Sequence, residues 1–497
     1  MKNKILYTCL LMVALGASSC SKWLELKPQD GIVREEFWKT KEQVDAAVTG
    51  IYASMLGTGT STPLAELLFI WGEARTDMVT PGFRASSSEN DIVNMNILPT
   101  NAFANWRTLY ATINYCNTVI QLAPGVLAKD NTFTQAQLDR AMGEAYAIRG
   151  MLYFYLVRTF KDVPLKLDAT ISDEDIRPMA KSSADSILNQ VVLDLKTAEP
   201  LLPLTYGNQA KDKGRATRYT VNAILADVYL WREKYAECAA ECDKVINSGS
   251  FGLVGTFTSM FDELFFRGNS AEAIFELQYD AQKINTFHPM LLSSTRRWGA
   301  APHLIEEVYG IDVINAVPIV DKRGDGCSLR ANDLTIWKYM GANDAGSALR
   351  AAEQSYAHWI FYRYADILLM KAEAINQMDQ PLEASRLVKS IRTRANALDF
   401  GMVMDSTDKQ GMEEYILQER QREFAFEGKR WYDVVRNAKR NNFANFRYLT
   451  DMVGISIPRE RQQVAFNKLK DENSLYFPIF LYELQSNKLL VQNPFYK

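Results

Sequence analysis

Histidine is scarce in this sequence, and the motifs of the commonest catalytic sites are missing. Only three histidines occur among the 497 residues, His288, His303 and His358, and no two of them are four residues apart. The sequence contains no H-E-x-x-H, no G-x-S-x-G and no G-x-x-x-x-G-K-[ST], which argues against the usual zinc-peptidase, serine-hydrolase and P-loop sites. We therefore predict no catalytic residue, no bound metal and no cofactor.

A strong excess of charge and long internal apolar runs are absent as well. Lys and Arg total 56 and Asp and Glu total 59, a net charge of −3, which is unlike a strongly basic nucleic-acid-binding protein. Beyond the first residues, no run reaches the ~20 apolar residues that a membrane-spanning helix needs. The composition, with 47% hydrophobic and 23% charged residues, is that of a globular protein with a large core.

The N-terminus has the layout of a secretory signal. Lys2 and Lys4 precede an apolar run, Ile5–Leu15, which is followed by small residues and then by Cys20. Small residues directly before a cysteine resemble a bacterial lipobox, although Ala17 stands where leucine is usual. This resemblance implies cleavage after residue 19 and a Cys20 acylated on its thiol and its new amine, which would anchor the chain firmly in a membrane. The alternative is an ordinary signal peptide with a chance cysteine.

Cysteine is too sparse for a disulfide framework. After cleavage before Cys20, four cysteines other than the acylated one remain, at positions 116, 238, 242 and 327. Cys238 and Cys242 are one helical turn apart, and we interpret them as small apolar helix residues, not as a metal-binding pair.

Most of the chain has the apolar spacing of three and four residues that places side chains on one face of a helix. Strand patterns are confined to Ala273–Tyr279 and Leu475–Ile479. We therefore predict a mostly α fold. The expected helical stretches are Thr108–Leu122, Arg140–Phe160, Thr220–Ile246, Trp359–Gln377, Leu382–Ala395 and Met412–Arg436.

An internal repeat organises these helices. Ile224–Ile246 aligns with Met370–Ser390 and its flanks at a shift of 146, so that Ala226 falls on Ala372 and Cys238 on Ala384. Each copy is a helix, a polar turn and a helix, as in a tetratricopeptide unit. Arg140–Phe160 with Ala184–Ala198 forms a third unit. Two long irregular inserts, 56–108 and 286–351, are rich in Gly, Pro, Ser and Asn, and we expect ligand binding there.

Five segments resemble motifs of one protein family. Cys20–Leu26, followed by Phe37 and Ala46–Tyr52, resembles the family's opening. The sequence FYRYADILLMKAEAIN resembles the family's "Arg-Tyr-Ala-Asp-x-Leu-Leu" helix, and ILQERQREFAFEGKRWYDVVR resembles its "Glu-Arg-x-x-Glu-x-x-x-Glu-Gly-x-Arg-Trp" signature. The other two are the helix that ends in a Val-Pro step and the C-terminal Phe-Pro-Ile…Gln-Asn-Pro segment. In chain order the four segments after the opening are Gly143–Leu165, Phe361–Asn376, Ile416–Arg436 and Tyr476–Tyr496. The family that they resemble is that of the SusD/RagB outer-membrane nutrient-binding lipoproteins.

The resemblance implies a tetratricopeptide-like helical scaffold whose long irregular inserts form the ligand-binding portion. It implies a signal peptide over residues 1–19 and a SusD-like domain over 20–497, with an N-terminal portion at 20–215 and a C-terminal portion at 216–497. It also implies a lipid-anchored protein on the exterior of the outer membrane. Members bind oligosaccharides, or peptides in some branches, and deliver them to a partner SusC-like TonB-dependent transporter.

Sugar binding requires aromatic faces for C–H patches and planar polar groups for hydroxyls, and both inserts supply them. In the family, ligand residues tend to come from these two regions. For Trp298, local packing is an equally open alternative to ligand stacking. The candidate ligand-binding residues are Asp77, Phe83, Arg84 and Asn90 in the first insert and Arg296, Arg297 and Trp298 in the second.

Other functions remain open at this stage. A surface glycoside hydrolase would need two carboxylates across a cleft, and Glu73 with Asp77 is a possible pair. A scaffold that binds only proteins is another alternative. Asp321–Asn332 imitates a calcium loop, but Arg323 and Asn332 stand where oxygen ligands are expected.

Overall fold

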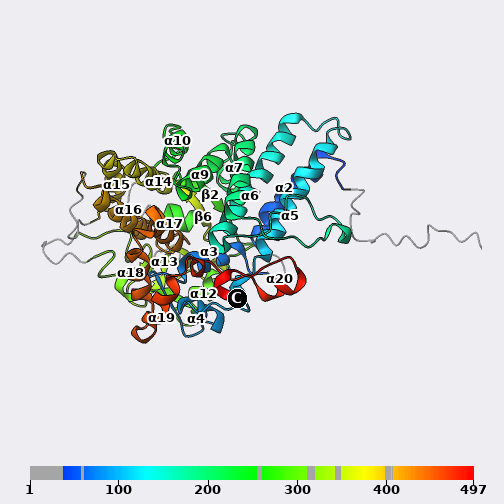
Figure 1. Cartoon of the computed structure of the whole chain (residues 1–497). Helices are drawn as coiled ribbons and strands as arrows, with labels where there is room; N and C mark the ends of the chain where they lie inside the picture. Colours follow the sequence, from blue (N-terminus) through cyan, green and yellow to red (C-terminus); the bar gives the residue numbers. More distant parts are fainter. Residues whose placement is uncertain are drawn as a thin grey trace, which may run out of the picture.

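The computed structural model describes residues 37–57, 61–254, 260–310, 319–341, 349–397, 405 and 407–497. The signal sequence and Cys20 lie outside these residues. Paired antiparallel helices form a continuous row (Figure 1), in which each pair packs on the next. The pairs are α2 (Lys41–Met55) with α5 (Arg107–Leu122), α6 (Gln135–Phe160) with α7 (Ala184–Leu201), α9 (Arg218–Trp231) with α10 (Tyr235–Ile246), and α14 (Tyr364–Gln377) with α15 (Pro381–Ala395).

This row confirms the prediction of a mostly α fold built from tetratricopeptide-like pairs. The two aligned repeats are the neighbouring pairs α9–α10 and α14–α15, which meet through α10 and α14. Cys238, Ala384 and Ala372 are all fully buried. Their small side chains let the adjacent helices approach closely. Cys238 and Cys242 are free thiols buried within α10, as the sequence indicates.

The longest helix, α6, is the centre of the core. From Ala147 to Phe160 every residue is buried, so this part of the helix is covered on all sides instead of along one stripe. Thr134 caps its N-terminus by accepting a hydrogen bond from the Gln137 amide. Arg149 joins α6 to α7 through two bonds to Asp194, at 2.7 and 2.8 Å. A buried, bidentate pair of this kind fixes the register of the two helices.

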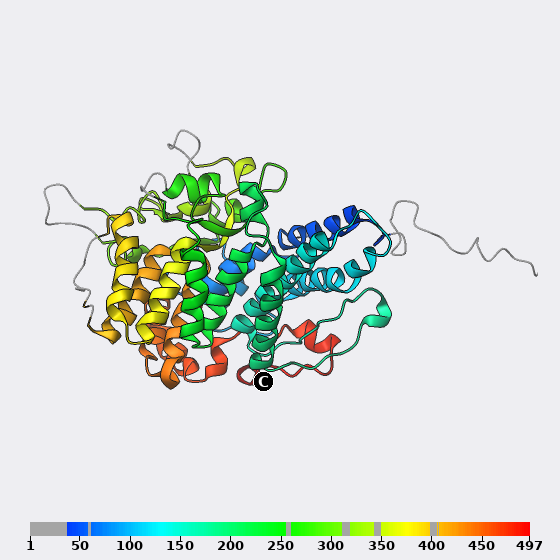
Figure 2. The same cartoon turned by 90° about the horizontal axis from the view of Figure 1, so that it is seen from above.

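The strands are short and lie along one side of the row of helices (Figure 2). Within the described residues they form three antiparallel pairs: β1 (Val79–Pro81) with β3 (Trp298–Ala300), β2 (Ala273–Leu277) with β6 (Trp359–Arg363), and β4 (Leu329–Arg330) with β5 (Thr335–Ile336). The prediction of a strand at 273–279 is confirmed by β2. The prediction at 475–479 is wrong, since this apolar segment is irregular buried chain that follows a short 3₁₀ turn.

Two predicted helices have different bounds. The stretch from Trp359 begins as strand β6, because its first five residues are all buried and pair with β2. The stretch 412–436 is divided into α16 (Lys409–Glu423) and α17 (Arg430–Phe443). The turn between them places Phe426 at φ 68° and Gly428 at φ 71°, left-handed backbone conformations that interrupt a right-handed helix.

The remaining helices are short and lie outside the row of pairs. No helix in the described part of the chain is long and apolar enough to span a membrane. These helices are α3 (Leu64–Glu73), α4 (Ser87–Val93), α8 (Gln209–Gly214), α12 (Phe287–Leu291), α13 (Trp337–Met340), α18 (Arg447–Ser456), α19 (Arg459–Leu469) and α20 (Leu481–Ser486).

Candidate ligand-binding surface

The two irregular inserts meet at the β1–β3 pair. Val79 lies opposite Ala300 and Pro81 opposite Trp298. The pairing continues beyond the strands, since the Gly82 amide donates to the Arg297 carbonyl at 2.6 Å. Segments more than two hundred residues apart in the sequence therefore form one surface. The chain can approach this closely because residue 82 has no side chain: a Cβ there would stand 2.3 Å from the Arg296 carbonyl oxygen.

Phe83 is the exposed aromatic side chain of this surface. It is 71% exposed, directly after Gly82 at the end of β1. Arg84 beside it is also exposed, and its amide donates to the Arg296 carbonyl at 3.3 Å. Arg296 itself is half-buried, with its guanidinium bonded to the Asp333 carbonyl. The junction thus presents an exposed aromatic side chain next in sequence to an exposed arginine.

Trp298 does not form part of the exposed face. Its side chain is fully buried, its Nε1 donates to Glu89 Oε1 at 2.7 Å, and its ring packs edge-on against Phe69. Of the two alternatives for this residue, the structure has the local packing, and the expectation of a stacking platform is wrong. The reason is the β1–β3 register, which turns this side chain inward onto α3.

Arg297 and Asn90 also make contacts within the protein. The Arg297 guanidinium bonds Glu89 and Glu66, both at 2.8 Å, and so ties the second insert to α3 and α4. Asn90 lies on the exposed side of α4, where its amide donates to the Ser86 carbonyl at 3.0 Å. Arg297 therefore holds the surface in shape, whereas Asn90 remains accessible beside it.

Asp77 lies at the edge of a cavity of about 240 Å³. It is 3% exposed, and it accepts two bonds from Arg430, at 3.0 and 2.9 Å, and one from Gln421 at 2.8 Å. The walls of the cavity come from α16, α17, α18 and residues 303–308. Neither α18 nor His303 belongs to a recognisable sequence motif, so the sequence contains no signal that places them at this cavity.

Glu73 and Asp77 do not form the carboxylate pair of a hydrolase. Glu73 is fully buried and does not line the cavity. Its Oε1 accepts from the amides of Gly428 at 2.7 Å and Lys429 at 3.3 Å. Burial outweighs these bonds and raises the pKa of Glu73 to about 8. With Asp77 occupied by Arg430, the two carboxyls have structural partners and do not face each other across a cleft.

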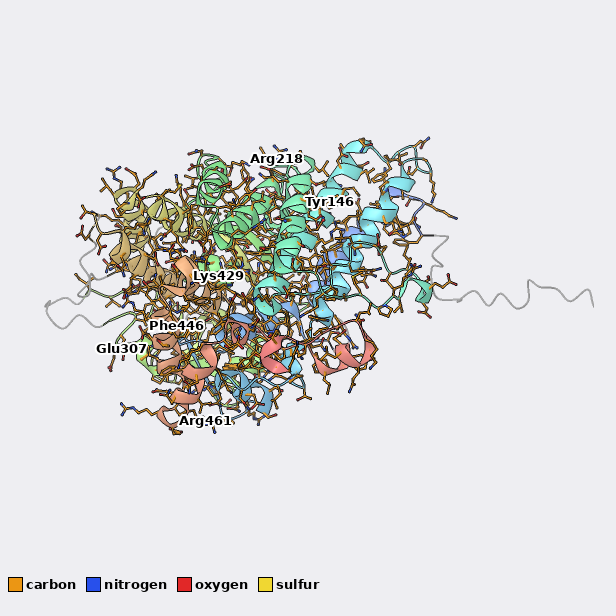
Figure 3. All side chains as sticks on the ribbon, viewed as in Figure 1. Tyr146, Arg218, Glu307, Lys429, Phe446 and Arg461 are labelled. Carbon is orange, nitrogen blue, oxygen red and sulfur yellow. The ribbon has the colours of Figure 1, made fainter. Side chains whose placement is uncertain are left out.

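The charged residues of the signature segment form a buried network. Their spacing of three and four residues suits pairing along one helix, and Arg422 pairs with Glu419 in this way at 3.5 Å, but other pairs join different elements. Arg363 of β6 reaches Glu272 and Glu423, both at 2.6 Å, and Glu427 at 2.9 Å. Burial opposes ionisation of Glu427, but Arg363 and Lys338 outweigh it and hold its pKa at about 2. Lys429, labelled in Figure 3, extends the network to Asp366.

The calcium-like loop belongs to the same network. Arg323 is fully buried and bonds Asp321 at 2.6 Å, Glu419 at 2.6 Å and Glu423 at 2.9 Å. Both Asp321 oxygens accept from this arginine. The Arg323 guanidinium thus occupies the place that a calcium ion would take in such a loop. The loop therefore anchors the second insert to α16.

Comparison with known protein families supports the fold. Residues 22–230 match the family described as starch-binding and associating with the outer membrane, and residues 326–496 match the SusD family. The chain belongs to the SusD-like family. A SusD-like protein of Formosa agariphila is 28% identical over 88% of this chain and 92% of its own length. One from Bacteroides ovatus is 22% identical over 91% of this chain and 84% of its own.

Solved structures share the SusD-like fold over nearly the whole chain. A SusD superfamily protein of Bacteroides thetaiotaomicron aligns with a TM-score of 0.71 at 22% identity, covering 93% of this chain and 99% of the other. A laminarin-binding SusD-like protein aligns with a TM-score of 0.68 at 20% identity, covering 92% and 99%. At these identities the likeness concerns the fold.

Proposed function

We propose that this SusD-like protein captures oligosaccharides at the outer surface of the outer membrane and delivers them to a SusC-like TonB-dependent transporter. In this proposal Cys20 carries the lipid anchor, and the protein performs no catalysis. The observation that carries the proposal is Phe83, an aromatic side chain left 71% exposed where the two inserts join.

The chemistry of this junction suits a sugar. An exposed phenyl face takes the C–H side of a pyranose ring, and arginine N–H groups donate to its hydroxyl oxygens. Asn90, accessible on the neighbouring α4, offers both a donor and an acceptor. Arg297 and Trp298 act indirectly, since they fix the two inserts to each other through Glu89. The family's starch-binding description and the laminarin-binding relative support a glycan ligand.

Phe83→Ala in the full mature protein tests this function. We expect the variant to lose binding to soluble starch, laminarin or another neutral polysaccharide by about tenfold or more, measured by affinity electrophoresis and calorimetry. Ile176→Ala is the matched control, because Ile176 is 67% exposed on a segment remote in sequence from both inserts. Wild-type protein that binds peptides and no glycan would instead favour the peptide-binding branch.

The transporter partnership needs a separate experiment. We expect the protein to copurify with a TonB-dependent transporter when membranes are solubilised in mild detergent, and mass spectrometry would identify the transporter. If the protein is recovered alone under conditions that preserve other outer-membrane complexes, the delivery role is wrong, whereas glycan capture could stand.

A further inference from the structure

A second cavity lies outside both inserts, where the ends of several helices meet. Its volume is about 580 Å³, within the ~300–1,000 Å³ of clefts that hold small molecules. Its walls are the C-terminal end of α6, the N-terminal end of α7, the turn between α9 and α10, Lys439 of α17, and Tyr476. Because α6 packs on α7 and α7 on α9 in the row of helices (Figure 1), the cavity is built on the helical scaffold.

Lys161, which follows the last residue of α6, has a strained backbone conformation at the wall of this cavity. Its φ is 66° and its ψ is −87°, close to the rare γ-turn conformation that is costly for a residue with a side chain. Residues held in such conformations cluster at binding sites. The Lys161 side chain lies over Tyr476, with its Nζ 5.6 Å from the ring centroid. A charged side chain at a position that suits glycine is the first observation that points to a ligand.

The half-buried cations of the cavity have few acidic partners. Lys161 and Lys439 both approach the same carboxylate oxygen, Glu472 Oε1, at 3.5 and 2.9 Å. Arg232 donates to the neutral amide oxygen of Asn189 at 2.8 Å. All three cations line the cavity and are half-buried. Two of them thus share one carboxylate and the third bonds a neutral group, which leaves positive charge for an anion.

The carboxylates that line the cavity do not cancel this charge. Asp162 Oδ1 accepts a hydrogen bond from the Ala184 amide at 3.0 Å and so caps the start of α7. Asp185 and Glu233 are exposed, as is the fourth cation of the lining, Lys234. Water and salt screen these three exposed charges. The half-buried part of the wall therefore remains positive.

Apolar side chains complete the cavity. Val157 and Leu188 belong to the buried core and also line the cavity. Trp231 is half-buried beside them, and its ring packs edge-on against Phe154 of α6 with the centroids 6.4 Å apart. A molecule that fills this space must therefore combine a negative group with an apolar ring or chain.

We propose that this cavity binds a small organic anion, with its phosphate or carboxylate group at Lys161 and Lys439 and its apolar part beside Trp231. The anion offsets the repulsion between the two ammonium groups, which otherwise share Glu472. The site is separate from the Phe83 surface, because none of its lining residues belongs to the inserts 56–108 and 286–351. The proposal therefore does not depend on glycan capture.

Phenyl phosphate tests this site by calorimetric titration of the full mature protein at low salt. We expect it to bind more tightly than benzyl alcohol, which lacks the charge, and than inorganic phosphate, which lacks the ring. Lys161→Gly should weaken phenyl phosphate binding by about tenfold or more. The same variant should unfold at an equal or higher temperature, because glycine adopts this backbone conformation without strain. Lys439→Gln should weaken binding as well.

Asp379→Gly is the matched control. Asp379 also has a positive φ, 61°, but it lies in the turn between α14 and α15 and does not line the cavity, so phenyl phosphate binding should be unchanged. Equal binding by wild type, Lys161→Gly and Lys439→Gln would overturn the site, and so would equal affinity for phenyl phosphate and benzyl alcohol. A lower unfolding temperature of Lys161→Gly would also overturn it, by assigning the lysine to the stability of the fold.

The outcomes separate this inference from the proposed function. Wild-type protein that binds none of the three probes, yet binds a glycan that Phe83→Ala loses, would overturn the anion site and leave glycan capture intact. Phenyl phosphate binding by a protein that binds no glycan would support the anion site and overturn glycan capture.

Discussion

Gly72 of α3 lies directly against Gly428 in the turn between α16 and α17. A Cβ added to Gly72 would stand 2.0 Å from the Gly428 carbonyl oxygen, well inside any allowed contact. The same turn donates its amides to Glu73. This contact joins the N-terminal insert to the signature segment and therefore positions the cavity beside Asp77.

Gly72→Ala should destabilise the protein severely. The added methyl group clashes with the turn unless the backbone of the turn shifts. Overpacking of this kind lowers the free energy of unfolding by ~1–3 kcal/mol or more. Gly50→Ala is the control, because no atom lies within 4 Å of a Cβ at that position in α2, and alanine there should stabilise by ~0.5–1 kcal/mol. Thermal and denaturant unfolding measure both. Equal stability of the two variants would contradict the close contact.

The raised pKa of Glu73 predicts a dependence of stability on pH. Between the carboxyl's ordinary pKa and its native value of about 8, the folded state binds the proton and the unfolded state does not. The free energy of unfolding should therefore fall as pH rises from about 5 to 8, by up to ~1.4 kcal/mol per pH unit from this group. Above that range the contribution becomes constant.

Glu73→Gln isolates this contribution. The amide cannot ionise and keeps an oxygen for the Gly428 and Lys429 amides, so we expect a shallower decline in stability over the same pH range. Denaturant unfolding of both proteins at several pH values gives the comparison. Parallel curves for wild type and variant would show that Glu73 titrates normally.

The buried Arg149–Asp194 pair should be essential for the α6–α7 unit. Arg149→Met leaves the Asp194 carboxylate in a site where its side chain is 2% exposed, and breaking such a pair costs ~3–5 kcal/mol. In contrast, Arg386→Met removes a surface pair with Glu383, whose side chains are 65% and 52% exposed, and should change stability by less than ~0.5 kcal/mol. A small effect of Arg149→Met in urea unfolding would mean that water reaches the pair.

Cys20→Ala should release the protein from membranes, because the thiol and the new amine of this residue are the expected sites of acylation. Fractionation of cells that produce the variant, with an immunoblot of the membrane and soluble fractions, measures the release. Alanine at Cys116, which is fully buried, serves as the control for loss of a cysteine. If Cys20→Ala stays with the outer membrane, the anchor lies elsewhere.

The sequence alone determined the helical class, the paired repeats and the family, because these depend on local periodicity and on motifs that survive as short strings. It also located both inserts and Phe83.

The sequence could not predict whether the Trp298 side chain points inward or outward. A residue on a short strand turns inward or outward according to the register of its partner strand, which here lies more than two hundred residues away in the sequence. The break between α16 and α17 could not be predicted from the sequence, for a similar reason. The Glu and Arg spacing around it fits one continuous helix, and only the partners in β6, α3 and the loop at Arg323 show that the charges pair across the core. The cavity beside Asp77 likewise exists only where four distant segments meet, so tertiary packing decided its position, its size and the set of charges around it.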